Sequence, residues 1–254
     1  GRYVAMITPK SLLNTPEFAV TRELLSAKNI YCIQDFGENG FKGVLVETIC
    51  VFIDNENDPG NTIVKSLTNN TCIDQKQSYI MDSNYPYWII YRNSFFDSVA
   101  SRLEFDNFTV FRDRQITNAN TSLERKNKCL RVLKSRNISD DGKKVLDIPG
   151  YDSYIDEDIV VGLSAYRFVG NTEVYLTPNM TYKPRVMRNK GKYVVNGSVA
   201  ILIPKDEFEL SDEQMAYFSS KEYRTFYQIA RNYQTRSLNV DATSVFFYGV
   251  LKEK

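Results

Sequence analysis

Short apolar runs separated by polar loops mark most of the elements that the sequence predicts. The first run, YVAMI at residues 3–7, predicts a strand buried on both faces, as in parallel sheets that are covered by helices. A buried strand needs neighbours on both sides, and no strand precedes this one in the sequence. We therefore expect the chain to be the C-terminal part of a larger protein.

The order of the next elements is that of an α/β sheet edge. NTPEFAVTRELLSAK at residues 14–28 predicts a helix, with Pro16 in its first turn and Phe18, Leu24 and Leu25 on its buried side. IYCIQDF and VLVETICVFID then predict two strands. The short loop GENGFKG between them suits an antiparallel pair better than a crossover.

The remainder predicts an α+β region of short strands with helices near its ends. NSFFDSVASRLEF predicts one helix, and a final helix is expected from Asp212 to Tyr233, with Ser211 as its N-cap. The fold class is therefore mixed: the edge of an α/β sheet, then an α+β domain. The expected boundaries are 1–55 for the first part, 56–75 for a linker and 76–254 for the second part.

Composition limits the chemistry that the chain can carry out. The 254 residues include no histidine, which excludes the usual catalytic triads and most catalytic zinc sites. The four cysteines form no CxxC pair and are expected to be free thiols in a reducing cytoplasm. No apolar run is long enough to span a membrane, and we expect no membrane partner.

The net charge of +1 hides an uneven distribution of basic residues. Residues 112–136 contain eight basic side chains against two acidic ones, and residues 183–192 contain five basic side chains and no acidic one. A basic face is thus compatible with a nearly neutral total. The alternative for each run is an ordinary solvated surface or charged hairpin.

Two segments of the N-terminal part resemble a known enzyme family. ITPKSLLNTPEFAVTRELL at 7–25, followed by IQDFGENGFKGVLVETICVFI at 33–53, resembles the end of the catalytic domain of adenine-N6 DNA methyltransferases from bacterial restriction–modification systems. In that family a strand, a helix, a strand ending DFG and a final edge strand complete the sheet. The resemblance implies that residues 1–55 are the C-terminal remnant of a Rossmann-like methyltransferase domain.

The family's catalytic motifs are missing from the chain. It has neither the glycine-rich turn that binds S-adenosylmethionine nor the Asn/Asp-Pro-Pro-Tyr/Phe tetrapeptide that holds the target adenine. NYPYW at Asn84 has a single proline and follows the predicted sheet. We therefore expect no catalytic, cofactor or metal site and no methylation by this chain alone, with S-adenosylmethionine bound by the full-length enzyme.

The second part resembles the target-recognition domains of type II methyltransferases and, more distantly, the specificity subunits of type I restriction enzymes. The segments concerned are LRVLKSRNI, YLTPNMTYKPRV, VNGSVAILIPK and YFSSKEYRTFYQIARNYQTRSLNV. The resemblance implies double-stranded DNA as a partner, together with the missing N-terminal methyltransferase portion or a catalytic subunit. A cognate restriction endonuclease and a location in the bacterial cytoplasm are further implications.

DNA contact is also what the chemistry of these segments favours. Lysine and arginine neutralise phosphates, while Arg, Asn and Gln at element ends form paired hydrogen bonds with base edges. The residues expected to read bases are Arg136, Asn137, Gln234 and Arg236. The residues expected to contact phosphates are Arg112, Arg114, Lys134, Lys183, Arg185, Arg188 and Lys190.

Two other functions stay open at this point. A stand-alone specificity subunit that recruits separate catalytic subunits would pack residues 1–53 against a partner chain. An unrelated hydrolase would use the acids Asp152, Asp156 and Glu157 of YDSYIDED, whose spacing suits a metal ion. We favour an exposed acidic loop for that segment, because no companion site is recognisable nearby.

Overall fold

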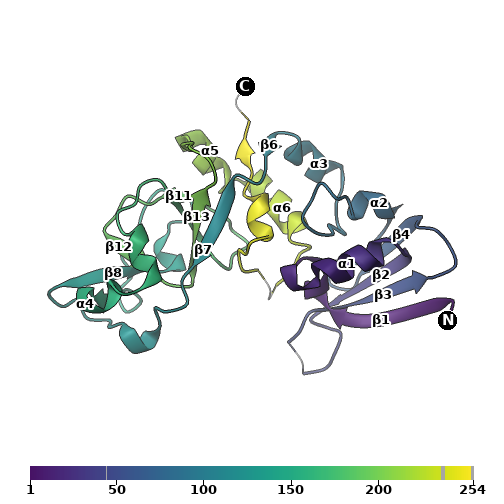
Figure 1. Cartoon of the computed structure of the whole chain (residues 1–254), viewed down its shortest axis with the longest axis horizontal. Coiled ribbons are helices and arrows are strands. Elements are labelled where there is room, and N and C mark those ends of the chain that lie inside the picture. The colour runs from purple at the N-terminus through teal and green to yellow at the C-terminus, as the bar shows by residue number, and fades with distance from the viewer. Residues whose placement is uncertain (44, 236–237, 253–254) are drawn as a thin grey trace. The chain divides into compact units, whose positions relative to one another are not determined.

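The computed structural model describes residues 1–43, 45–235 and 238–252 (Figure 1). The chain divides into two compact units, unit 1 with residues 1–98 and 228–238, and unit 2 with residues 99–227 and 239–254. In both units small sheets are joined by long loops and short helices, which confirms the mixed α+β class.

Unit 1 is built on one sheet with the strand order β1-β3-β2-β4-β5. β3 is antiparallel to both β1 and β2, whereas β2 and β4 are parallel. The antiparallel pair that the loop GENGFKG predicts, β2 and β3, is confirmed. The elements are β1 (Tyr3–Pro9), α1 (Ala19–Ser26), β2 (Asn29–Gly37), β3 (Thr48–Asp54), β4 (Asn61–Ser66), β5 (Thr71–Lys76), α2 (Gln77–Ile80) and α3 (Ser94–Ala100).

The first strand forms, but the prediction that it is buried on both faces is wrong for the described chain. β1 pairs with β3 alone among the described residues, and the side chains of Tyr3 and Ile7 are 58% and 56% exposed. β3 is the buried strand, and it lies between β1 and β2 instead of at the sheet edge that the family pattern predicts.

The predicted linker at 56–75 is also wrong, because most of it belongs to the sheet. β4 and β5 pair along their whole length, and β4 adds to β2 in parallel. Thr62 and Val64 alternate with more exposed neighbours along β4, the pattern of a strand with one buried face. Only residues 55–60, which connect β3 to β4, lie outside helices and strands at the start of the predicted linker.

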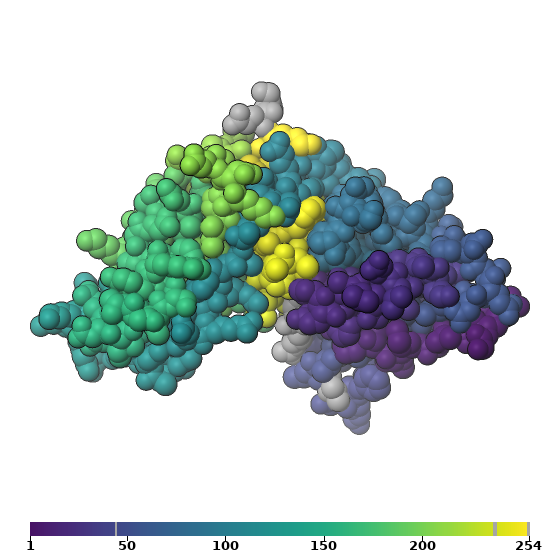
Figure 2. Space-filling model, in the orientation of Figure 1, coloured from purple at the N-terminus to yellow at the C-terminus, as the bar shows by residue number. Residues whose placement is uncertain are grey.

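α1 lies across one face of this sheet with an unusual distribution of side chains (Figure 1). Its buried residue is Arg22, whose guanidinium donates to the carbonyls of Leu12 and Thr15. Val20 and Leu24, one turn apart, are each 68% exposed, so the predicted burial of Leu24 is wrong. Figure 2 shows α1, in dark purple, at the surface.

Unit 2 contains two larger sheets, with the orders β11-β10-β13-β7 and β12-β8-β9, and the small pair β14-β6. β12 and β8 are parallel, and the other pairings are antiparallel. The strands are β6 (Leu103–Glu104), β7 (Phe108–Arg112), β8 (Cys129–Leu133), β9 (Ser153–Asp156), β10 (Tyr175–Pro178), β11 (Met187–Arg188), β12 (Tyr193–Val195), β13 (Val199–Pro204) and β14 (Val250–Leu251). The α-helices are α4 (Glu157–Val160), α5 (Asp212–Tyr217) and α6 (Lys221–Ala230).

The sheet β12-β8-β9 is buried on both faces. Leu133 and Val195 pack into one core cluster, while their neighbours Val132 and Val194 pack into another. Successive residues of a strand point to opposite faces, so this double burial follows from the continuous apolar runs LRVL and YVV.

The predicted final helix is two helices. Ser211 caps α5 in a capping box with Gln214, as its position in the sequence predicts. The helix then ends, because the Ser220 hydroxyl accepts from the backbone amide of Tyr223 and starts α6. The aromatic side chains of α6, Tyr223, Phe226 and Tyr227, are buried and form its packed side.

Candidate nucleic-acid interface

Two basic segments of unit 2 contact one turn, residues 196–198, and a third segment is bonded to one of them. β7 ends at Arg112 opposite Ala200 of β13, and a Cβ atom added to Gly197 would lie 2.7 Å from the carbonyl oxygen of Asp113. The Ser198 hydroxyl accepts from the backbone amide of Ser135 at 3.1 Å. We call residues 112–114, 134–136 and 183–185, grouped around this turn, the basic rim.

The third segment of the basic rim is joined to the second by a side chain. The guanidinium of Arg185 donates from Nη2 to the carbonyl of Ser135 at 3.1 Å and from Nη1 to that of Lys183 at 3.0 Å. Residues far apart in the sequence are thus brought to a single edge of unit 2. Of the rim cations predicted to contact DNA, Arg114, Arg136 and Lys183 are exposed, and Arg112 and Lys134 are half-buried.

Arg185 itself is buried, and its prediction as a phosphate contact is corrected. Its side chain is 8% exposed, and Nε donates to the carbonyl of Ile138 at 3.2 Å in addition to the two bonds above. Burial lowers the pKa of the guanidinium, and the charge of Asp140 acts in the opposite direction. Its donors are used by backbone carbonyls, so it organises the rim instead of facing DNA.

Asn137 is also corrected, because its amide is fully buried. Its Nδ2 donates to Asp152 Oδ1 at 2.6 Å and to the carbonyl of Leu146 at 2.9 Å, and its Oδ1 accepts from the amide of Lys134. Asp152 also accepts from Arg131 at 3.0 Å. The amide that was expected to read a base therefore holds the loop behind it.

Arg136 and Lys134 share one aromatic neighbour, Tyr151. The Arg136 guanidinium carbon lies 4.7 Å from the centroid of the Tyr151 ring, and the Lys134 ammonium lies 4.1 Å from it. The ammonium also donates to the backbone carbonyl of Tyr151. Burial lowers the pKa of Lys134, and the charge of Asp152 opposes this effect.

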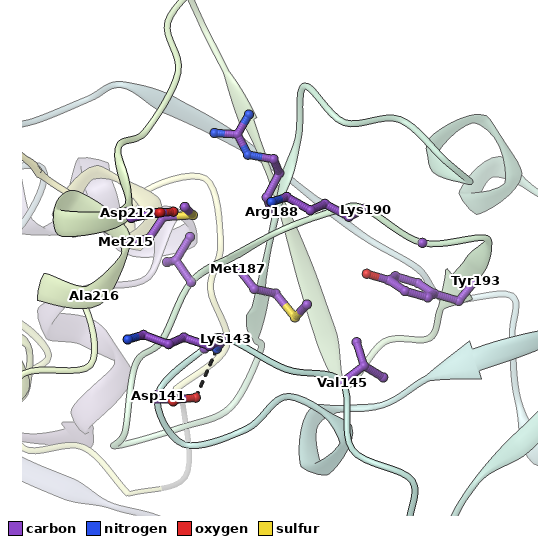
Figure 3. Close-up of a pocket in the computed structure, with 13 residues that line it drawn as sticks. Asp141, Lys143, Val145, Met187, Arg188, Lys190, Tyr193, Asp212, Met215 and Ala216 are labelled. Atoms are coloured by element: carbon purple, nitrogen blue, oxygen red, sulfur yellow. Dashed lines mark hydrogen bonds between the residues drawn. The ribbon is translucent and has the colours of Figure 1, made fainter.

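Arg188 and Lys190 lie in a separate surface pocket of about 560 Å³ (Figure 3). Its floor is apolar, with Met187 and Val145 labelled in the close-up. Arg188 pairs with Glu209 and donates to the carbonyl of Leu210 at 3.0 Å, so it already has acidic and carbonyl partners. Their contact with phosphates stays a prediction, and none of the basic rim lines this pocket.

Two predicted base readers fall outside unit 2. Gln234 is fully buried in unit 1, where it exchanges hydrogen bonds with the Asn14 amide at 2.6 and 3.1 Å. Its prediction as a base reader is therefore corrected, since no donor or acceptor reaches the surface. Arg236 lies outside the described residues.

A second polar cluster occupies unit 1 at the carboxyl ends of β1 and β2, which run in the same direction on either side of β3. Lys10 Nζ lies 2.7 Å from Asp35 Oδ2 and 3.9 Å from Glu47 Oε1, and the Tyr91 hydroxyl donates to Asp35 at 2.5 Å. Burial, followed by the charge of Asp35, raises the pKa of Tyr91, which keeps its hydroxyl a donor. The adjoining cavity has only about 130 Å³, and the charges around it are paired, so we assign the cluster a structural role.

The acidic segment gives no support to a metal-dependent hydrolase. In the described part of the chain no group of three His, Cys, Asp or Glu side chains is placed to hold a metal ion. Asp152 is occupied by Asn137 and Arg131, and Asp156 caps α4 by accepting from the amide of Asp158. Nor do these residues include a helix long and apolar enough to cross a membrane.

Sequence reasoning missed Tyr151 and Ser198. Ser198 could have been suspected from NGS, a turn signal directly before an apolar strand. Tyr151 gives no such signal, because its contact with Arg136 depends on the path of the loop between β8 and β9.

No protein-family model matches the chain, and no curated protein matches it. Among solved structures, it is similar to the type IIL restriction-modification enzyme MmeI in complex with DNA, with a TM-score of 0.50 and 11% identity over 96% of this chain and 38% of that chain. The type IIG restriction endonuclease BpuSI gives a TM-score of 0.42 and 10% identity over 99% of this chain and 40% of that chain. The chain thus spans about two fifths of these enzymes. The likeness to MmeI concerns the fold, which is that of a part of a restriction-modification enzyme.

Proposed function

We propose that the chain binds duplex DNA through the basic rim and is the recognition portion of a site-specific restriction–modification enzyme. The observation that carries the proposal is that three basic segments, distant in the sequence, lie together in unit 2. The fold shared with MmeI, a structure described as a complex with DNA, supports it. Phosphate contacts by the rim cations supply the affinity.

The salt dependence of binding tests this proposal. If Arg112, Arg114, Lys134 and Lys183 each contact one phosphate, the logarithm of affinity falls with that of salt with a slope of about −3.6. Affinity should then drop about 150-fold between 50 and 200 mM salt. Lys183→Ala should weaken binding to all sequences alike and make the slope shallower by about one unit.

The matched control is Lys221→Ala, since Lys221 is an exposed lysine at the start of α6 and outside the rim. It should leave the slope unchanged. Binding by the whole chain that is insensitive to salt, or equal effects of the two substitutions, would exclude the basic rim as the DNA surface.

We propose further that this recognition portion serves an adenine-N6 methyltransferase whose S-adenosylmethionine site lies outside these 254 residues. β1 has one side free among the described residues, with exposed Tyr3 and Ile7. Exposed apolar groups and an unpaired strand edge are unfavourable in water. Further strands of a catalytic domain, added to β1, would pair its free edge and cover its exposed apolar side chains. The resemblance of 7–53 to the end of such a domain supports this arrangement.

The alternative is a specificity subunit that recruits separate catalytic subunits through the same surface. The coding sequence upstream of Gly1 separates the two. An open frame with a glycine-rich turn and an Asn/Asp-Pro-Pro-Tyr/Phe tetrapeptide would support the methyltransferase. A start codon directly before Gly1 would favour the separate subunit.

A further inference from the structure

Arg136 differs from the other exposed rim cations, Arg114 and Lys183, because its side chain packs on an aromatic ring above an ordered turn. It is the middle residue of a 3₁₀ turn, Ser135–Asn137, in which the amide of Asn137 donates to the carbonyl of Lys134 at 2.8 Å. Its own side chain is exposed, with the guanidinium 4.7 Å from the centroid of the Tyr151 ring. An arginine packed on an aromatic face keeps the N–H donors at its edge available.

Arg185 supports this turn from the inside. Its Nη2 donates to the carbonyl of Ser135, the first residue of the turn, at 3.1 Å. Its Nε donates to the carbonyl of Ile138, directly after the turn, at 3.2 Å. A guanidinium makes such paired bonds in a fixed plane, whereas an ammonium cannot match the same geometry. On the other side of the turn, the Ser198 hydroxyl accepts from the amide of Ser135.

We infer that Arg136 reads a guanine in the major groove and that Tyr151 and Arg185 are positioning residues that fix its direction. This inference rests on the proposed DNA binding. A guanidinium forms two hydrogen bonds with O6 and N7 of guanine, and this pair discriminates only if its orientation is fixed. Within the described part of the chain, the other exposed rim cations, Arg114 and Lys183, have no such ring contact, and we assign them to phosphates.

The experiment is a selection of bound duplexes from a pool of random sequence, using the whole chain and variants at equal fractional saturation. The wild-type protein should enrich a motif with guanine at one fixed position. Arg136→Lys should reduce the preference for guanine at that position by about tenfold while total affinity in low salt stays within about threefold. Arg136 is exposed, so this variant tests the inference without affecting folding.

The positioning residues are tested by matched pairs of variants. Tyr151→Leu removes the ring and should abolish the preference for guanine at the same position. Tyr151→Phe keeps the ring and should retain this preference. Arg185→Lys keeps the charge but not the paired bonds and should behave as Tyr151→Leu does. Arg125→Ala, an exposed residue of the same basic run, is the control and should keep the full motif.

The outcomes separate this inference from the proposed function. Salt-dependent binding without any enriched guanine, or a guanine that Arg136→Lys leaves intact, would overturn the inference alone. So would variants of Tyr151 and Arg185 that alter thermal stability but not base preference, because their role would then be only structural. Absence of salt-dependent duplex binding would overturn the proposed function as well.

Discussion

The buried pair of Lys10 and Asp35 makes a quantitative prediction for unit 1. Asp35 is fully buried and accepts three hydrogen bonds, from Lys10 Nζ at 2.7 Å, the Tyr91 hydroxyl at 2.5 Å and the amide of Gly37 at 2.9 Å. In Asp35→Asn an NH₂ group replaces one carboxylate oxygen. A hydrogen-bond donor then faces Lys10 and the Tyr91 hydroxyl, which are themselves donors. Lys10 then keeps only the carboxylate of Glu47, 3.9 Å away.

Removing one partner of a buried ion pair costs about 3–5 kcal/mol. Lys10 is still attracted by Glu47, and Asn can still accept the hydrogen bond from Gly37. We therefore expect Asp35→Asn to lower the free energy of unfolding by about 3 kcal/mol, the lower end of that range. With an m-value of about 2 kcal/mol/M, the urea midpoint should fall by about 1.5 M. We expect the double variant Lys10→Met/Asp35→Asn to be less destabilised than the two single changes added together, because no unpaired ammonium is left buried.

The chain provides its own probe for this measurement. Trp88 is its single tryptophan, lies buried in unit 1 and donates to the Ser26 hydroxyl at 2.9 Å. Its fluorescence in urea therefore reports on the unfolding of unit 1. Asp74→Asn, at an exposed position of β5 in the same sheet, is the control. A midpoint shift for Asp35→Asn no larger than that of the control would refute the role assigned to the buried pair.

Three further outcomes follow from unit 2. Burial would raise the pKa of Asp152, but its hydrogen bonds and the charge of Arg131 outweigh that effect, so the pKa is lowered. The stabilisation by Asp152 is therefore complete above its unfolded pKa of about 4 and is lost as pH falls through the folded value. In thermal melts between pH 3 and 6, the loss of melting temperature caused by Asp152→Asn should become smaller as pH falls. Ser211→Ala should cost about 1 kcal/mol of unfolding free energy by removing the α5 cap, and equal stability would contradict the capping box. Gly142 and Gly150 both have positive φ, but only at Gly142 would a Cβ atom meet backbone, 2.7 Å from the Val186 carbonyl oxygen. Gly142→Ala should therefore lower the melting temperature more than Gly150→Ala, and equal shifts would show that backbone strain alone matters.

How much the sequence could predict depended on the range of the interactions involved. The strands β1, β2 and β3, the antiparallel pair β2–β3 and the cap at Ser211 rest on local patterns, and these predictions are confirmed. The order of strands in the sheet does not rest on local patterns. A continuous apolar run such as YVAMI is compatible with a central strand and with an edge strand, and here β3 lies between β1 and β2.

The candidate site shows the same limit at the level of single side chains. Arg136 and Asn137 are adjacent in a polar segment, and their residue types suit base reading equally well. In the fold, Arg136 is exposed while Asn137 satisfies the backbone of Lys134 and Leu146. Buried backbone groups must find partners, and Arg and Asn side chains meet that need as readily as they meet DNA. Residue type alone could not separate the two uses.

This double use of polar side chains explains how affinity and base preference can be separated within the basic rim. Lys183 reaches solvent from a loop end, so its charge matters more than its orientation, and Lys183→Ala should act on every sequence alike. In our inference the direction of Arg136 depends instead on the bonds that Arg185 donates to the carbonyls of Ser135 and Ile138, and on the Tyr151 ring. A change in those supports should alter which base is preferred while the phosphate contacts persist. We therefore expect base preference to depend partly on Tyr151 and Arg185, which do not themselves contact DNA in the proposed complex.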